Sequence, residues 1–90
     1  MSERTVPDFV DAPPLCDFVT DYDRAQVRLY ARLLDAEADG AALAEIARIL
    51  FGIDAQDDPE RARNVHDRHL ARARWMAQNG YRDLLNGHTA

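Results

Sequence analysis

Residues 43–53 read Leu-Ala-Glu-Ile-Ala-Arg-Ile-Leu-Phe-Gly-Ile, and the rest of the predicted fold is organised around them. Its apolar side chains recur at helical spacing, with Leu43, Ile46, Ala47 and Leu50 at i, i+3, i+4 and i+7. Gly52 ends the pattern, so we predict a short helix over residues 42–51. A helix of this length buries too little surface to be stable alone, so it must pack against a longer neighbour.

The following residues supply that neighbour. Asp58-Pro59-Glu60 combines an N-cap acceptor, a proline at the first helical position and a carboxylate at the positive end of the helix dipole. We therefore predict a long helix over residues 59–79, with Gly80 as a left-handed cap. A short apolar helix, a turn and an arginine-rich helix form the pattern of a helix-turn-helix. The long link from Gly52 to Asp58 marks it as a variant.

A further helix is predicted over residues 22–38, because Thr20 and Asp23 offer capping groups and Asp39-Gly40 ends the pattern. This helix is apolar on two sides. One stripe comprises Val27, Tyr30, Ala31, Leu34 and Ala38, and the other comprises Tyr22, Leu29, Leu33 and Ala36. One stripe faces the helix-turn-helix, and the other must be covered by the N-terminal segment, by the C-terminal turn or by another protein.

These elements predict an all-α fold: a helix-turn-helix variant of three main helices with a short C-terminal helical turn over residues 81–86. The helical domain spans residues 20–86, and residues 87–90 form a disordered end. Residues 1–19 hold three of the four prolines and no helical period, and they read as a flexible, extended acidic arm. Its apolar residues leave two interpretations, a strap across the core or a segment that orders on a partner.

Composition narrows the function class. Of the 90 residues, one is cysteine, and neither an export leader nor a long apolar run is present, so we expect a cytoplasmic protein. The net charge is −5, yet residues 61–90 hold six arginines against two aspartates. The last long helix is therefore the one basic surface, with acidic neighbours in the sequence.

No pattern of residues predicts catalysis. His66 and His69 lie at i and i+3 without further ligands at fixed spacing, so we predict no metal site. A glycine-rich phosphate loop and a nucleophile elbow are absent, and Cys16 has no base partner at the level of sequence. We predict a protein that is not an enzyme and has no cofactor.

A helical projection of residues 59–79 places Trp75 beside arginines on the face opposite the predicted core. Either the turn at residues 81–85 covers Trp75, or Trp75 is an exposed anchor for a protein partner. The candidate protein-binding surface comprises Asp57, Asp58, Arg61, Asn64, Arg68, Ala71, Arg72 and Trp75. The second candidate surface comprises Tyr22, Leu29 and Leu33.

Four stretches carry a family resemblance. They are residues 33–41 (LLDAEADGA), 45–50 (EIARIL), 58–63 (DPERAR) and 69–76 (HLARARWM), followed by Asn79-Gly80-Tyr81-Arg82-Asp83-Leu84-Leu85. Together they resemble the proteobacterial domain of unknown function 2285, over most of residues 20–86. That family is known as a helix-turn-helix variant in regulators of integrative and conjugative elements.

The resemblance implies a transcriptional antiactivator that binds FseA-like and quorum-sensing TraR-like activators by protein contact. It would thereby repress excision and conjugative transfer of the element. The charges agree with this interpretation, because Asp54, Asp57, Asp58 and Glu60 lie where phosphates would approach the long helix. We therefore expect weak or absent DNA binding and favour a monomer.

Two other classes remain open. One is an autonomous helix-turn-helix regulator that reads DNA with Arg61, Asn64 and Arg68. The other is a structural subunit of a larger complex.

Overall fold

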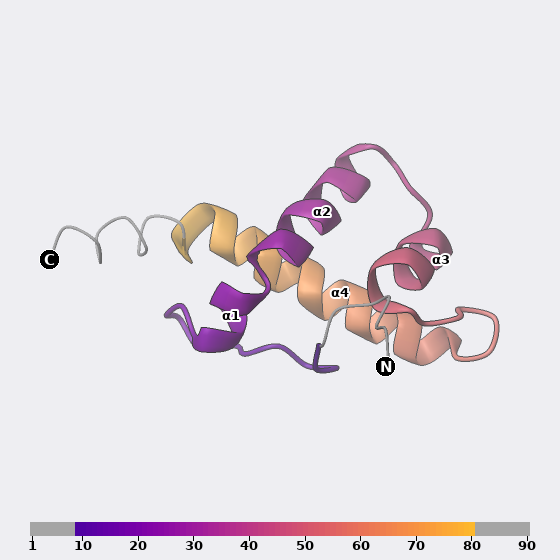
Figure 1. The fold of residues 1–90 in the computed structure, drawn as a ribbon, viewed down its shortest axis with the longest axis horizontal. Helices are drawn as coiled ribbons and strands as arrows, with labels where there is room; N and C mark the ends of the chain where they lie inside the picture. The colour runs from indigo at the N-terminus through magenta and orange to yellow at the C-terminus, as the bar shows by residue number, and fades with distance from the viewer. Residues whose placement is uncertain (1–8, 81–90) are drawn as a thin grey trace, which may run out of the picture.

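The computed structural model describes residues 9–80. The long helix α4 (Pro59–Trp75) runs through the molecule, and α2 (Val27–Ala38) packs across it. The short helix α3 (Leu43–Ile46) packs against the N-terminal part of α4 (Figure 1). Between residues 9 and 80 the chain forms helices, turns and loops without a strand. The all-α prediction is confirmed.

The helix expected over residues 22–38 is divided in two. The helix α1 (Asp21–Ala25) is followed by Gln26, whose φ of −106° and ψ of 17° lie outside the helical region, and then by α2. Thr20 and Asp23 form the predicted capping box. The break has no local sequence signal, since neither glycine nor proline is present there. Gly40, with φ of 78°, directly follows the C-cap of α2 as predicted.

The short helix changes its winding. After α3, residues 47–51 form the π-helical segment η1 (Ala47–Phe51). Gly52 has φ of 66°, and the Ile53 N–H donates to the Ala47 carbonyl at 3.0 Å. This left-handed glycine and the bond that spans six residues form a Schellman-type end. The sequence predicted the position of this end and missed the π-helical winding.

The long helix begins at Pro59 as predicted and ends differently. Asp58 occupies the N-cap position, but its side chain makes no capping hydrogen bond, so that detail of the prediction is wrong. After Trp75 the chain continues as the π-helical segment η2 (Met76–Gly80), so Gly80 is the last residue of a helical segment. The turn expected at residues 81–86 lies outside the described residues.

The core lies between α2, η1 and α4. Leu33, Phe51 and Val65 are at most 2% exposed, one from each of these elements. A second apolar cluster joins Tyr30 of α2 to Ala73 at the end of α4 and Met76 of η2. Burial of these side chains provides the main stabilising free energy of a domain this small.

Residues 9–19 cover one side of this core. The ring of Phe9 meets that of Phe51 edge-on, with centroids 5.1 Å apart, and Val19 is buried. The Val10 N–H also donates to the Tyr22 hydroxyl at 3.1 Å. Residues 9–19 therefore fit the first of the two interpretations of the arm, a strap across the core.

Candidate nucleic-acid interface

The outer face of α4 carries the residues of the candidate interface. Arg61, Asn64, Arg68 and Ala71 are exposed and follow one another at helical spacing along one side. The opposite side of the helix, which includes Val65, is buried in the core. The core packing of α4 thus presents this row of side chains to solvent.

Arg61 is held by the arm. Its Nε donates to Asp11 Oδ2 at 2.9 Å and its Nη2 donates to Asp11 Oδ1 at 3.0 Å. The two residues, 50 positions apart in sequence, thus form a bidentate ion pair. The hydrogen bond from Arg61 lowers the pKa of Asp11, and the same bond raises the pKa of Arg61. The guanidinium also lies 5.8 Å from the centroid of the Phe9 ring. A carboxylate therefore already occupies the place that a phosphate would take on Arg61.

Arg68 and Asn64 keep their polar groups available. Within residues 9–80, no ion pair or side-chain hydrogen bond involves either of them. Arg68 is close enough to Asp11 that its charge contributes to lowering the pKa of that carboxyl. Arginine and asparagine are the side chains that hydrogen-bond guanine and adenine edges in the major groove.

Arg72, predicted as a surface contact, is buried with 4% of its side chain exposed. Its Nε and Nη2 donate to the two carboxylate oxygens of Asp23 at 3.0 and 2.7 Å. It also donates to the carbonyls of Cys16 at 2.6 Å and Phe18 at 2.8 Å. The prediction for Arg72 is therefore wrong, because its donors are used inside the protein.

The Asp23 carboxylate is satisfied on all sides. Burial alone would raise its pKa, but hydrogen bonds from Arg72, the Thr20 backbone and the Tyr30 hydroxyl outweigh burial and lower the pKa to about 2. Burial and the hydrogen bond to Asp23 raise the pKa of Tyr30. This ionised cluster joins the arm, α1, α2 and α4.

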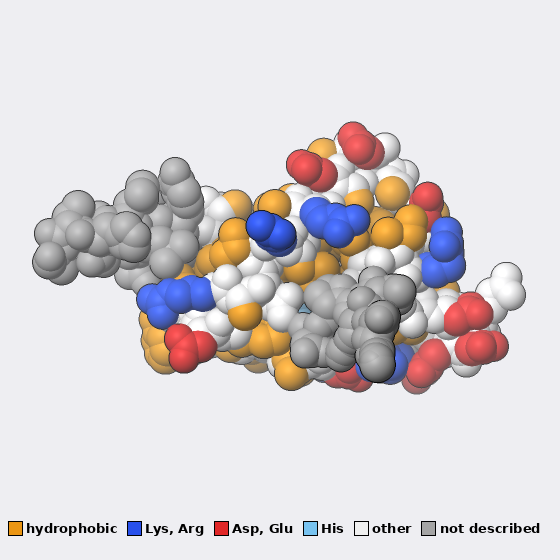
Figure 2. Space-filling model, in the orientation of Figure 1, with side chains coloured by type: hydrophobic (Ala, Val, Ile, Leu, Met, Phe, Trp, Pro, Cys, Tyr) orange, Lys and Arg blue, Asp and Glu red, His pale blue; other side chains and the backbone are white. Residues whose placement is uncertain are grey.

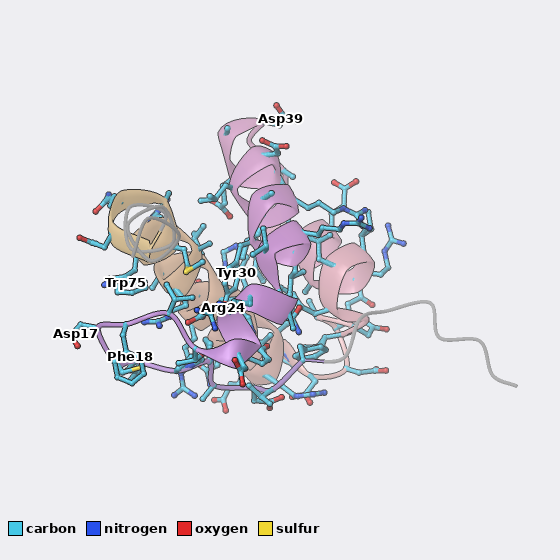
Figure 3. The ribbon with its side chains drawn as sticks, turned by 60° about the vertical axis from the view of Figure 1, so that its left-hand side comes forward. Asp17, Phe18, Arg24, Tyr30, Asp39 and Trp75 are labelled. Atoms are coloured by element: carbon cyan, nitrogen blue, oxygen red, sulfur yellow. The ribbon has the colours of Figure 1, made fainter. Side chains whose placement is uncertain are left out.

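Trp75 packs on Arg72, the arginine of this ionised cluster. The guanidinium of Arg72 lies 4.0 Å from the centroid of its ring, and the side chain is half-buried. Figure 3 shows Trp75 on α4 together with Tyr30 of α2, and both residues belong to the second apolar cluster. The cation beneath the ring is internal, so Trp75 has a structural contact that the sequence did not reveal.

The acidic residues lie at the entry to α4. Asp57 and Asp58 are exposed in the loop between η1 and α4, and Asp54 Oδ1 accepts a hydrogen bond from the Gln56 N–H at 2.9 Å. Glu60 is exposed in the first turn of the helix. The carboxylates thus gather at one end of α4, whereas Asn64 and Arg68 lie one to two turns further along.

The second candidate surface is interior. Leu29 and Leu33 are 5% and 0% exposed. Tyr22 is half-buried, and its hydroxyl is 2.7 Å from His69 Nε2. The prediction that these residues form a docking surface is wrong, because this stripe of α1 and α2 faces α4 and η1.

The two histidines of α4 have separate partners. His69 Nδ1 donates to the Val65 carbonyl at 2.9 Å, so its Nε2 accepts from the Tyr22 hydroxyl. Burial lowers the pKa of His69.

His66 instead lies between two carboxylates, Glu37 at 2.6 Å and Asp67 at 2.8 Å. Among the described residues, no group of three or more histidine, cysteine, aspartate or glutamate side chains is arranged to hold a metal ion.

Sequence reasoning missed two partners at this site, Asp11 and Asp23. Each contacts α4 from about 50 positions away. No local pattern links such residues, because their pairing depends on how the arm and α1 cross α4.

Over residues 9–80, none of the helices has the length and apolar character needed to cross a membrane.

Comparison with known proteins adds one match. A family model named RovC_DNA-bd, described as "T6SS, Transcription factor, DNA binding domain", matches residues 4–86. No curated protein matches the chain.

The match corrects one prediction. The family is a DNA-binding domain, which contradicts the expectation of weak or absent DNA binding. The predicted contacts with FseA-like and TraR-like activators receive no support. The narrower resemblance to the domain of unknown function 2285, and within it to the antiactivator QseM, stays a prediction beside this regulator family.

Proposed function

The chain belongs to the family of T6SS transcription factor DNA-binding domains, and we therefore propose that it binds duplex DNA and regulates transcription. The surface proposed for DNA is the exposed row on α4, with Asn64 and Arg68 directed to base edges. Arg61 contacts a backbone phosphate in place of Asp11. The observation that carries the proposal is the family match over residues 4–86.

The geometry of α4 supports this assignment. The helix is the longest in the described structure, it is buried on one side, and its other side holds exposed arginine and asparagine without competing ion pairs at Arg68. In helix-turn-helix proteins the second helix of the motif enters the major groove. Here that helix is α4, which follows α3 and η1.

The acidic loop limits how the duplex approaches. Asp57, Asp58 and Glu60 are exposed at the N-terminal end of α4, where they repel phosphates. A duplex that contacts the middle of α4 avoids this end. We therefore place the centre of the interface between Asn64 and Arg68.

The test is selection from a pool of random duplexes, followed by titration of the enriched duplex with the protein, using fluorescence anisotropy. We expect a saturable, sequence-specific complex. Arg68→Ala and Asn64→Ala should each weaken binding by about tenfold, the usual effect of losing a bidentate base contact.

Arg24→Ala is the matched control, because Arg24 is an exposed arginine of α1 whose described partner is Asp21. It removes the same charge without touching α4. A lack of enrichment, or equal losses in Arg24→Ala and Arg68→Ala, would contradict the assignment.

A further inference from the structure

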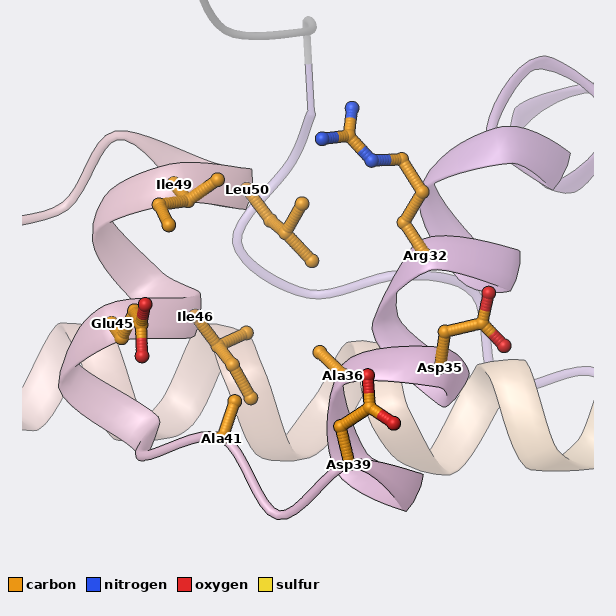
Figure 4. A pocket seen from close by; sticks show the side chains of 9 residues that line it. All are labelled: Arg32, Asp35, Ala36, Asp39, Ala41, Glu45, Ile46, Ile49 and Leu50. Carbon is orange, nitrogen blue, oxygen red and sulfur yellow. The ribbon is translucent and has the colours of Figure 1, made fainter.

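A groove lies between α2 on one side and α3 with η1 on the other. It consists of two adjoining hollows of about 470 and 350 Å³, which share Arg32, Ile49 and Leu50. Figure 4 shows Ile46 and Leu50 pointing toward α2 across the second hollow, which Ile49 also lines, with α4 behind them. Ile49 is 46% exposed, which leaves apolar surface open to solvent.

The α2 wall of the groove carries one ordered stripe of charge. Arg28, Arg32, Asp35 and Asp39 fall at successive intervals of four, three and four residues, so they share one side of the helix. All four are exposed, and within the described residues none forms an ion pair with another side chain. In Figure 2, basic side chains gather over the middle of α2 and acidic ones over its C-terminal end.

The opposite wall extends this division. Glu45 of α3 lines the hollow that contains Asp35 and Asp39, and no described acid lines the hollow that contains Arg28. One end of the groove is therefore acidic and the other basic, over an apolar floor.

We propose that this groove is the interface of a homodimer in which the α2 helices of two copies lie antiparallel. A two-fold axis between residues 33 and 34 pairs Arg32 with Asp35 of the second copy and Arg28 with Asp39 of the second copy. Each pairing occurs twice, as a two-fold interface requires. Ile49 of each copy is covered at the same time.

A second copy fits this groove better than an acidic peptide does. An acidic peptide would satisfy Arg28 and Arg32 but would meet Asp35, Asp39 and Glu45 at the other end. A second α2 satisfies both ends because its own charges run in the opposite direction. The groove opens away from α4, so the dimer leaves the outer face of α4 uncovered (Figure 4). The inference does not depend on DNA binding, and it replaces the expectation of a monomer.

The experiment is sedimentation equilibrium at low salt on the parent chain, on Arg32→Asp and on Asp35→Arg. The parent should move from 10.2 kDa towards twice that mass as concentration rises. Each single variant places like charges opposite one another at two symmetric positions, so its dissociation constant should rise by about tenfold or more. Circular dichroism checks that each variant is folded.

The decisive sample is the equimolar mixture of the two single variants. In the mixed dimer, the aspartate introduced at position 32 of one copy faces the arginine introduced at position 35 of the other. The second pair consists of the unchanged Arg32 and the unchanged Asp35, so attraction is restored in both pairs. The mixture should therefore dimerise where neither variant alone does.

Arg63→Asp is the matched control, since it makes the same charge change on the exposed side of α4 and should leave dimerisation unchanged. A parent that stays at 10.2 kDa up to about millimolar concentration would overturn the proposal. Single variants that dimerise as the parent does, or a mixture that stays monomeric, would also overturn it.

Discussion

At the scale of single residues, Arg72 and Asp23 form a buried link between the N-terminal half of the chain and α4. Their ion pair is buried and two-pronged, and further donors and acceptors satisfy both groups. Such a pair contributes little net stability compared with apolar residues, but removing one partner leaves the other charge buried without compensation. The pair therefore ties α1 and residues 16–18 of the arm to α4.

Replacing Arg72 tests this role. Arg72→Met should lower the free energy of unfolding by about 3 kcal/mol, because Asp23 would remain as an unpaired buried carboxylate. Urea unfolding followed by circular dichroism measures the change. Arg68→Ala, at an exposed position without a described partner, should change stability by about 0.5 kcal/mol or less. Equal effects of the two variants would show that the ion pair has no such role.

The same pair predicts a loss of stability in acid. The pKa of Asp23 is about 2 in the folded protein, against an ordinary value of 3.8, so the unfolded chain binds more protons between pH 4 and pH 2. Stability from this group is fully present above pH 4 and falls as the pH drops through that window, by about 2 kcal/mol in total. Urea unfolding at several pH values and a carbon-13 titration of the Asp23 carboxyl measure the effect. A carboxyl that titrates at or above 3.8 would contradict the prediction.

At the scale of elements, the arm competes with DNA for Arg61 of α4 in the proposed interface. Residues 9–19 are held on the core by Phe9 and by Val19, and this anchoring places Asp11 on Arg61. The ion pair is exposed, with side-chain exposures of 45% and 54%, so it contributes little to stability. Its main consequence is electrostatic, because a carboxylate stands at the edge of the proposed interface.

Removing that carboxylate should strengthen DNA binding. Asp11→Asn frees Arg61 for phosphate and removes, beside Arg68, a negative charge that repels phosphates, so the affinity should rise by about threefold at low salt. Anisotropy titration with the selected duplex measures it. Asp17→Asn removes an equal charge from an exposed position of the same arm and should have a smaller effect (Figure 3). Equal gains in both variants would mean that only net charge matters.

At the scale of the whole molecule, an acidic chain exposes a cluster of arginines on α4. The chain has a net charge of −5, while α4 exposes four arginines (Arg61, Arg63, Arg68 and Arg74) against Glu60 and Asp67. The proposed DNA surface lies on the outer side of α4, and the proposed dimer surface lies on the α2 side, which faces away from it. A protein of negative net charge can therefore present a locally basic face, because screening limits repulsion from distant acids to about 8–10 Å.

The helical class, the positions of the main helices and most of their ends could be predicted from the amino-acid sequence. These features depend on local chemistry: apolar spacing around residues 43–50, the capping box at Thr20 and Asp23, Pro59 at a first helical position, and glycines at 40 and 52. The sequence also placed Asn64 and Arg68 on an outward face, because helical periodicity alone separates that face from the core.

Which polar side chains remain available for a partner depends on the tertiary contacts. Arg72 and Arg68 lie on the same helix, four positions apart, yet the first is buried against Asp23 and the second is exposed. Tertiary contacts also determine which apolar stripe of the first predicted helix is buried. The same holds for the break at Gln26 and for the position of Asp11 on Arg61. Each depends on contacts between residues far apart in sequence, and local periodicity contains no information about where such segments cross.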